Sequence, residues 1–410
     1  MKKRRLKKSA LFILIFLILV IILVVFSILT PKKKINLKEE KKEVKEEYKA
    51  SDYYAEFAQI TNDTKLYIFE NNTYQEVGTI YKDAKITLEN SEEKYFKIKD
   101  SRYYIYYDSF SKSDELKKDL SYQRWIPYNE NIEGENLTLS KDGKKVFTIK
   151  EKLNLPIYRK TEDKNYVLYD QELYEINKDE GNIISSENSN DTKASSVAVL
   201  NYHFFYDPEK GETCNQIICH TKKQFISHLE YLKENNFTTL TAEDLKLFLK
   251  KEINVPKTSL VITIDDGYLA ELGVELLNEY KMNGTLFLIT SWYHPQDFQN
   301  EYVKLESHSH DMHNTGVCPT GQGGAIQCWP DDKILEDLKT SQNELGGSTV
   351  FCFPFYEYNS HSIELLKQAG FEMSFVGGNK KASPGVDLFQ IPRYVIGSNT
   401  TLEDFKRKIN

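Results

Sequence analysis

The chain has 410 residues, which is too long for one small domain and predicts two or three domains. Hydrophobic residues make up 40% and charged residues 28%, a balance that excludes disorder throughout. Residues 1–50 carry 14 Lys/Arg against 5 Glu, whereas the remainder carries 40 basic against 56 acidic residues, a net charge of −16. A body this acidic repels phosphate, so we expect no nucleic-acid partner.

The first structural signal is the uncharged apolar run Ala10–Leu29. Its 20 residues would span about 30 Å as a helix, the thickness of a bilayer's hydrocarbon core. A cleaved signal peptide is the alternative, but such peptides have a shorter apolar region and a small-residue cleavage site. We therefore expect an uncleaved transmembrane anchor at 10–29 behind a basic cytoplasmic tail at 1–9. Lys and Arg flank the run on both sides, so their count does not set its orientation.

The Lys/Glu-rich segment 30–50 predicts a charged linker, because the apolar repeat of a coiled coil is missing. Residues 51–190 then show short Tyr/Ile/Phe runs separated by Asn, Asp and Gly, which predicts a β-rich region. Tyr103–Tyr107 and Tyr166–Tyr169 suggest two degenerate copies of a small module that weakly resembles SH3-like modules. This region has no His or Cys, so a metal site is not expected, and its aromatic runs fit strand cores better than sugar-stacking surfaces.

Residues 196–410 alternate between strand and helix patterns, which favours an α/β fold with a parallel sheet closed or nearly closed into a (β/α) barrel. The expected strands are 197–202, 259–264, 285–289, 303–306, 350–353, 373–376 and 390–395. The expected helices are 223–235, 241–250, 269–280, 332–345, 362–369 and 401–409, with Thr241 as an N-cap.

Reactive side chains fall at the ends of these strands, and one of them falls within the last strand. They are His203, Asp265, Asp266, His308, His310, His313 and Arg393. In β/α barrels the carboxyl ends of the strands form the catalytic face, so these residues are expected to converge. One Asp with two His gives three ligands and open positions, the arrangement that holds catalytic divalent metals. Taken alone, Asp265-Asp266-Gly267 could be a turn and the His cluster a polar loop.

Two of these stretches resemble motifs of the polysaccharide deacetylase family of the NodB-like kind. Thr263–Gly267 is similar to the family's first motif, which implies Asp265 as general base and Asp266 as a metal ligand. Ser307–His313 is similar to the second motif, which implies His308 and His313 as ligands of a divalent metal, Zn²⁺ above all. Their five-residue spacing resembles the branch that acts on poly-N-acetylglucosamine. Asn201-Tyr202-His203 resembles an element of that branch and implies His203 as general acid.

The third motif of the family is only partly matched by Phe351–Asn359. Members often carry an Arg two residues before its Pro and a Gly two residues after, where this chain has Cys352 and Tyr356. We expect Arg393 to replace that Arg as the partner of Asp265. Trp292, Phe355 and Tyr356 are candidates for stacking on sugar rings, although aromatic core residues are equally common.

All five cysteines lie in the last domain. Cys214 and Cys219 bracket one short loop and Cys318 and Cys328 another, a pattern that suits two disulfides in an outward-facing protein. A zinc ribbon is disfavoured because the Cys-x-x-Cys spacing is absent, and Cys352 is expected to be a buried free thiol.

The sequence thus predicts a membrane-anchored, single-pass protein with an extracellular metal-dependent N-deacetylase domain. The expected substrate is an N-acetylated surface polymer, either peptidoglycan or poly-N-acetylglucosamine. An O-acetyl esterase on the same fold and a non-catalytic wall-glycan-binding protein remain alternatives. The sequence leaves the oligomeric state open.

Overall fold

The computed structural model describes residues 49–50, 53–91, 93–186 and 192–410. The predicted anchor at 10–29, the tail before it and residues 30–48 of the linker lie outside the described residues. Within the described ranges, no helix combines the length and the apolar character that crossing a membrane requires.

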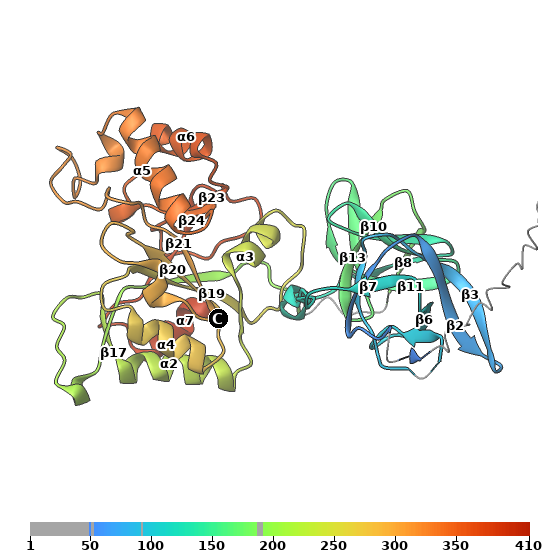
Figure 1. Ribbon diagram of the computed structural model, residues 1–410. Coiled ribbons are helices and arrows are strands. Elements are labelled where there is room, and N and C mark those ends of the chain that lie inside the picture. Colours follow the sequence, from blue (N-terminus) through green and yellow to red (C-terminus); the bar gives the residue numbers. More distant parts are fainter. Residues whose placement is uncertain (1–48, 51–52, 92, 187–191) are drawn as a thin grey trace, which may run out of the picture. The chain divides into compact units, whose positions relative to one another are not determined.

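The β-rich region expected at 51–190 consists of antiparallel strands, coloured blue to green in Figure 1. The strands are β1 (Phe57–Ile60), β2 (Thr64–Glu70), β3 (Thr73–Ile80), β4 (Lys85–Thr87), β5 (Tyr95–Lys97), β6 (Tyr103–Tyr106), β7 (Phe110–Lys112), β8 (Glu130–Gly134), β9 (Leu137–Lys141), β10 (Lys144–Ile149), β11 (Leu153–Lys160), β12 (Lys164–Tyr169), β13 (Glu172–Asn177) and β14 (Asn182–Ser185).

Eleven of these strands form one sheet in the order β14-β8-β11-β12-β13-β9-β10-β3-β2-β6-β5, and β4-β1-β7 form a second sheet. The pairing of β3 with β10 joins the two expected copies, whose buried residues make one core from Ala58 to Ile176. Apolar and polar residues alternate along the strands, as in Leu66, Tyr67 and Ile68, because antiparallel sheets expose one face. The likeness to SH3-like modules stays a prediction.

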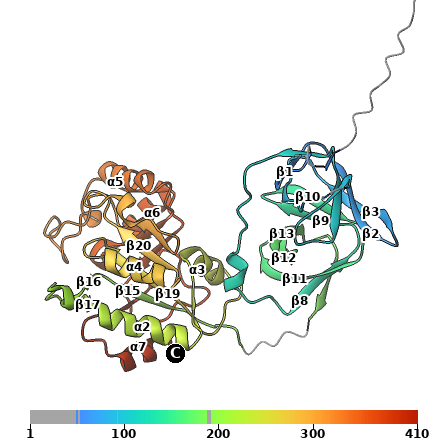
Figure 2. The same ribbon diagram turned by 60° about the horizontal axis from the view of Figure 1, so that its bottom comes forward.

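The C-terminal region is the predicted α/β fold with a parallel sheet. Its strands include β15 (Ala198–Tyr202), β18 (Thr238–Thr239), β19 (Ser259–Asp266), β20 (Gly284–Leu288), β21 (Val303–Ser307), β22 (Val350–Cys352), β23 (Met373–Val376), β24 (Ile391–Pro392) and β25 (Tyr394–Val395). The helices are α2 (Lys222–Glu234), α3 (Ala242–Leu249), α4 (Glu271–Glu279), α5 (Asp331–Glu344), α6 (Ser360–Ala369) and α7 (Leu402–Ile409). A short parallel pair, β16 (Phe204–Tyr206) and β17 (Cys219–Thr221), lies outside the main sheet. Figure 2 shows β15, β19 and β20 inside this region with α2, α4 and α5 on its outside.

The sheet order β24-β23-β22-β21-β20-β19-β15-β25 explains how the barrel nearly closes. β24 and β25 lie at opposite ends of this order, yet only Arg393 separates them in the chain. The expectation of one strand at 390–395 was wrong, because the chain passes from one sheet edge to the other at Arg393. A single residue therefore sits where the two edges meet, and its side chain is fully buried.

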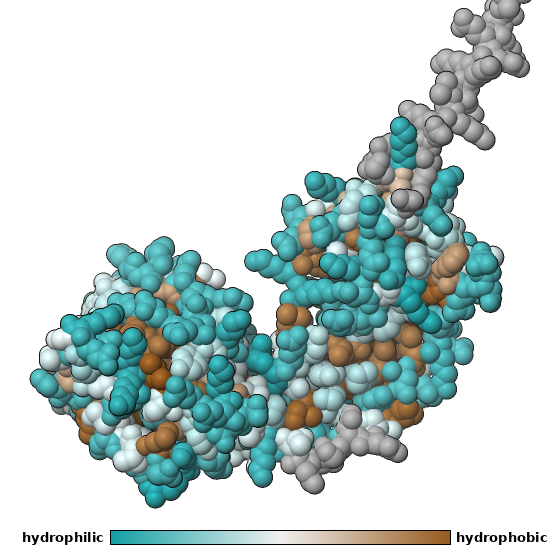
Figure 3. Space-filling model, turned by 90° about the horizontal axis from the view of Figure 1, so that it is seen from below, coloured by the Kyte–Doolittle hydropathy of each residue, from teal (hydrophilic) through white to brown (hydrophobic). Residues whose placement is uncertain are grey.

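The helices begin where the sequence predicts them to within a few residues. Thr241 caps α3, since its Oγ1 accepts from the amide of Asp244 at 3.1 Å, and Thr221, Asn359 and Thr401 form the same capping box at α2, α6 and α7. Each helix buries apolar side chains, such as Leu229 of α2 and Phe405 of α7. On the face shown in Figure 3, hydrophilic residues predominate and apolar ones form patches, because most large apolar side chains lie in the cores.

Candidate metal centre and catalytic site

The two adjacent carboxylates leave the barrel at the carboxyl end of β19, a strand that is buried along its whole length. Successive side chains of a strand point to opposite sides, so the carboxylates of Asp265 and Asp266 point in different directions. Asp266 has φ of 79° and Gly267 of 104°, which turns the chain sharply away from the sheet. A Cβ at Gly267 would meet Tyr293 at 2.7 Å, so only glycine fits there. A non-glycine residue held at positive φ is typical of strained functional sites.

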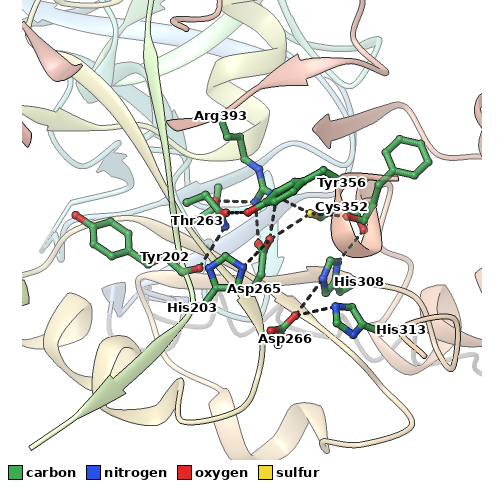
Figure 4. Close-up of polar contacts among 12 residues, drawn as sticks. Tyr202, His203, Thr263, Asp265, Asp266, His308, His313, Cys352, Tyr356 and Arg393 are labelled. Atoms are coloured by element: carbon green, nitrogen blue, oxygen red, sulfur yellow. Dashed lines mark hydrogen bonds and ion pairs between the residues drawn. The ribbon is translucent and has the colours of Figure 1, made fainter. Parts of the chain in front are cut away.

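Asp266, His308 and His313 bring three ligand atoms to one point (Figure 4). Oδ1 of Asp266 lies 3.2 Å from Nε2 of His308 and 3.3 Å from Nε2 of His313. Nδ1 of His308 donates to the carbonyl oxygen of Cys352 at 2.8 Å, which leaves its Nε2 lone pair directed at the cluster. An orienting bond of this kind is the usual support of a metal-binding histidine. The donor set therefore fits a divalent cation that prefers nitrogen and oxygen ligands.

A second group of potential ligands, Asp265, His308 and Cys352, is also closely spaced. The guanidinium of Arg393 already contacts both Asp265 and the Cys352 thiol, the latter at 2.8 Å. A metal ion there would be repelled by this buried positive charge. The Asp266 group is therefore the better metal site.

Asp265 is held by Arg393 in a two-bond, fork-like pair. Nη1 of Arg393 donates to Oδ1 at 2.7 Å and Nη2 donates to Oδ2 at 2.8 Å, with both side chains buried. Burial by itself would raise the pKa of Asp265, but the adjacent guanidinium lowers it well below the usual range. Asp265 is thus ionised at neutral pH and able to accept a proton.

Arg393 is in turn fixed by its surroundings. Its Nη1 donates to Oγ1 of Thr263 at 3.0 Å, and its guanidinium lies against the rings of Phe287 and Tyr356 at 5.7 and 5.4 Å. The structure thus pairs Arg393 with Asp265, as expected from the sequence. Cys352 occupies the sequence position at which family members often carry the arginine that partners this carboxylate.

His203 follows β15 and places its Nε2 4.0 Å from Oδ2 of Asp265 (Figure 4). Burial lowers the pKa of His203, while Asp265 and Asp266 act in the opposite direction. The imidazole is therefore neutral at pH 7. Its buried Nδ1 has no hydrogen-bond partner among the described residues, so this atom is not committed to holding the fold.

A pocket of about 380 Å³ opens directly on Asp266 and His313. Its walls are largely aromatic: Phe204, Tyr268, Trp292, Tyr293 and Phe355. Trp292 and Tyr268 are each 48% exposed, so both offer a ring to solvent beside the reactive groups. Such pockets, apolar with a few polar groups, bind small organic moieties.

Of the three expected sugar-contact residues, Trp292 and Phe355 lie on this pocket and Tyr356 does not. The hydroxyl of Tyr356 donates to Oδ1 of Asn201, and its ring covers Arg393, so the structure gives it a supporting place instead. Tyr268 was missed in the sequence. Only the turn at Gly267 brings it to the pocket, and no pattern in the chain marks that.

The structure joins Cys214 to Cys219 and Cys318 to Cys328, and leaves Cys352 as a buried free thiol. Gln216, within the first disulfide loop, lines the pocket. His310 lies apart from the metal group, with its Nδ1 2.9 Å from Oγ1 of Thr290.

In comparison with known proteins, residues 252–374 match the model of the polysaccharide deacetylase family. A poly-β-1,6-N-acetyl-D-glucosamine N-deacetylase of Staphylococcus aureus strain MRSA252 is 26% identical over 249 residues, covering 52% of this chain and 83% of that protein. Among solved structures, a de-N-acetylase from Aggregatibacter actinomycetemcomitans covers 52% of this chain and 99% of its own, at 20% identity and a TM-score of 0.44. A polysaccharide deacetylase from Bacillus cereus covers 72% of this chain and 93% of its own, at 16% identity and a TM-score of 0.44.

Proposed function

We propose, from the polysaccharide deacetylase domain that this chain contains at residues 252–374, that it removes acetyl groups from the N-acetylglucosamine units of a surface polysaccharide. It is a hydrolase of carbon–nitrogen bonds other than peptide bonds. One observation carries the proposal: Nε2 of His308 and Nε2 of His313 both lie within 3.3 Å of Oδ1 of Asp266, beside a separate ionised carboxylate, Asp265.

Asp266, His308 and His313 would hold a divalent metal, and Zn²⁺ fits this set of one carboxylate and two imidazoles. Such an ion, when bound, supplies Lewis acidity to the amide oxygen and lowers the pKa of water from 15.7 to about 7. The specific ion is part of the proposal.

The remaining roles belong to the residues around this group. Asp265 takes a proton from the attacking water, and Arg393 keeps its carboxylate ionised and oriented. His203 delivers a proton to the departing amine nitrogen. Because the free imidazole is neutral, it must first gain that proton, and Oδ2 of Asp265 lies only 4.0 Å from its Nε2. The products are acetate and a glucosamine unit.

The aromatic pocket supports a sugar substrate. Trp292 and Tyr268 present broad rings next to the metal group, where a pyranose can stack while its acetamide reaches Asp266. The name of the staphylococcal relative favours poly-β-1,6-N-acetylglucosamine over peptidoglycan as the polymer.

The apolar run Ala10–Leu29 supports a location at the cell membrane, with the catalytic region outside the cell where such polymers lie. Two disulfides in the C-terminal region agree with an oxidising compartment.

Acetate release tests the proposal directly. The full chain in detergent is incubated with poly-β-1,6-N-acetylglucosamine, peptidoglycan and acetylxylan, with and without a chelator. We expect acetate from an N-acetylated polymer, loss of release with chelator and recovery with Zn²⁺. The variant His313→Gln should lose metal and activity, whereas His361→Gln is the matched control, since His361 is exposed and pairs with Asp331.

Other outcomes would point elsewhere. Acetate from acetylxylan alone would make the chain an O-acetyl esterase. Release that is indifferent to the chelator would remove the metal from the reaction, and glycan binding without any release would indicate a binding protein.

A further inference from the structure

A continuous group of aromatic rings lies on the outward side of the β-rich region, on strands whose inward residues belong to its core. We call this group the aromatic face; it comprises Tyr67, Phe69, Tyr74, Tyr95, Tyr104 and Tyr106. Along β2 these rings alternate with the buried Leu66 and Ile68, and along β6 with the buried Tyr103 and Ile105. The rings therefore belong to the outward side of the strands, on four neighbouring strands in the order β3-β2-β6-β5.

The rings touch one another across the strands. Tyr74 stacks on Tyr95 with centroids 3.8 Å apart and planes 15° apart. Tyr95 meets Tyr67 and Tyr106 at 5.2 Å each, and Tyr74 also meets Tyr104 at 5.3 Å. Phe69, which is 46% exposed, extends the group from Tyr74 at 4.8 Å. The result is one surface of amphipathic rings.

The fold does not require rings at these positions. The adjoining strands β9 and β10 belong to the same sheet and cover the same core, yet they place Thr138, Ser140 and Thr148 outward. Phe69 is exposed and the five tyrosines of the face are half-buried. Contiguous aromatic surface that is open to solvent in this way is unusual on soluble proteins and marks interaction sites. The aromatic face is a local departure from the sheet's ordinary polar exterior.

The charges around the aromatic face indicate the kind of ligand that matches it. Lys65 pairs with Glu76 at 2.7 Å, Lys97 pairs with Glu89 at 3.1 Å, and the hydroxyl of Tyr74 donates to Glu93 at 2.8 Å. In the two lysine–glutamate pairs the opposite charges cancel, so these lysines form no positive patch for a phosphate polymer and the face complements an uncharged ligand better. Tyrosine combines a flat apolar ring with a hydroxyl, which suits sugars that show apolar C–H faces and hydroxyl edges.

We propose that the aromatic face is a second glycan-binding surface, separate from the catalytic pocket, that takes the uncharged N-acetylated amino-sugar polymer. The identity of the polymer rests on the proposed function, while the binding surface rests on the rings themselves. Its role is to retain the polymer on the enzyme independently of turnover. An uncharged ligand predicts that retention hardly changes with salt, in contrast to attraction of a deacetylated, cationic polymer by an acidic protein.

Binding by the full chain in detergent tests the proposal, with fully N-acetylated poly-β-1,6-N-acetylglucosamine as the probe and chelator present to prevent turnover. We compare Tyr95→Thr with Tyr95→Phe, because Thr keeps strand propensity without the ring and Phe keeps the ring without the hydroxyl. Ile183→Thr is the matched control, since Ile183 is a 54% exposed apolar residue on β14 of the same region.

We expect Tyr95→Thr to weaken the Kd about tenfold, the equivalent of one lost stacking contact, and Tyr95→Phe to change it by less than about twofold. Ile183→Thr should bind like the wild type. Acetate release from a short soluble N-acetylated oligosaccharide should be the same in all four proteins. Equal polymer binding by Tyr95→Thr and wild type would overturn the proposal, as would binding that disappears at high salt.

Two further measurements keep the result interpretable. If Tyr95→Thr fails to fold, limited iodination of the wild type, mapped by mass spectrometry, should show that polymer protects Tyr74 and Tyr95; no protection overturns the proposal. If Tyr95→Thr instead dissociates an oligomer without affecting polymer binding, the face is a self-association surface and the proposal is wrong. Polymer binding that depends on the aromatic face, without any acetate release, refutes only the proposed function. Acetate release without such binding refutes only this inference.

Discussion

The C-terminal barrel and the β-rich region place their polar groups in opposite ways. The barrel buries Asp265, Asp266, His308 and Arg393 together at the carboxyl ends of parallel strands. The β-rich region carries ion pairs that are partly open to solvent, such as Lys97 with Glu89, and turns rings outward.

Strand direction accounts for the difference. Parallel strands end at the same edge, so polar residues that follow them converge where neighbouring elements exclude water. Antiparallel strands alternate direction, so their polar and aromatic side chains lie along the outward face of the sheet instead of meeting at one edge. Buried charges make a reactive site possible, and exposed rings make a contact surface. Removing a buried charge should therefore cost far more than removing an exposed one.

The largest effect is expected from Asp265→Asn. The amide keeps the shape of the side chain but cannot accept the proton from water, so acetate release should fall by about 10²–10⁴-fold. Bound zinc, measured by atomic absorption, should be unchanged, because Asp265 is not in the Asp266 group. Near-normal release would show that another group is the base.

Arg393→Met should cost about 3–5 kcal/mol of unfolding free energy, since it leaves the buried Asp265 without its partner. Burial then raises the pKa of Asp265, so the acidic limb of the pH–rate profile should move to higher pH. Urea unfolding and rate measurements check both effects. Arg407→Met is the matched control, because that arginine is exposed and pairs with Asp404 on the surface. Equal stability losses in the two variants would contradict the comparison.

Acid should destabilise the barrel through His220 and His228. Burial lowers the pKa of each to about 4 from 6.5, so the folded state resists protonation that the unfolded chain accepts. Their contribution to stability is complete above pH 6.5 and is lost as the pH falls toward 4. At pH 5 the expected loss is about 2 kcal/mol for each histidine.

Denaturant unfolding at pH 7 and pH 5 measures this loss, with His228→Gln as the variant, because Gln can still bond to the hydroxyl of Tyr202. The variant should lose about half of the pH dependence. An unchanged dependence would show that other groups cause it.

Tyr356→Phe should lower stability by about 1 kcal/mol, because Asn201 loses the hydroxyl that bonds to it. The KM for polymer should not change, since Tyr356 does not line the pocket. A marked rise in KM for this variant would restore Tyr356 as a sugar contact.

Lys97→Met should have the smallest effect, within about 0.5 kcal/mol, because its pair with Glu89 is solvent-exposed on both sides. Thermal unfolding and acetate release should match the wild type. A large loss of stability would mean that the β-rich region depends on its surface charges. The difference between this region and the barrel would then be smaller than we expect.

Much of the site could be predicted because its residues stand next to strong local patterns. Asp265 and Asp266 end an apolar β-branched run before a glycine, and His308 and His313 follow the next but one strand. The alternation of strands and helices predicts a parallel sheet, whose strands end at one shared edge. The convergence of these four side chains could therefore be predicted. Tyr268 and Tyr356 were not predictable in the same way, since exposure and burial of an aromatic ring depend on packing by distant segments.

The sequence alone determined the α/β alternation, the strand ends that carry the carboxylates and imidazoles, the β-rich character of residues 51–190 and the cysteines that can pair, because each depends on neighbours close along the chain. Only the tertiary structure decided that the chain crosses from one sheet edge to the other at Arg393, that the ring of Tyr356 covers this arginine, and that six rings of separate strands form one outer surface. Those contacts join residues far apart in sequence, and their geometry is set by how the barrel closes and how the sheets pair.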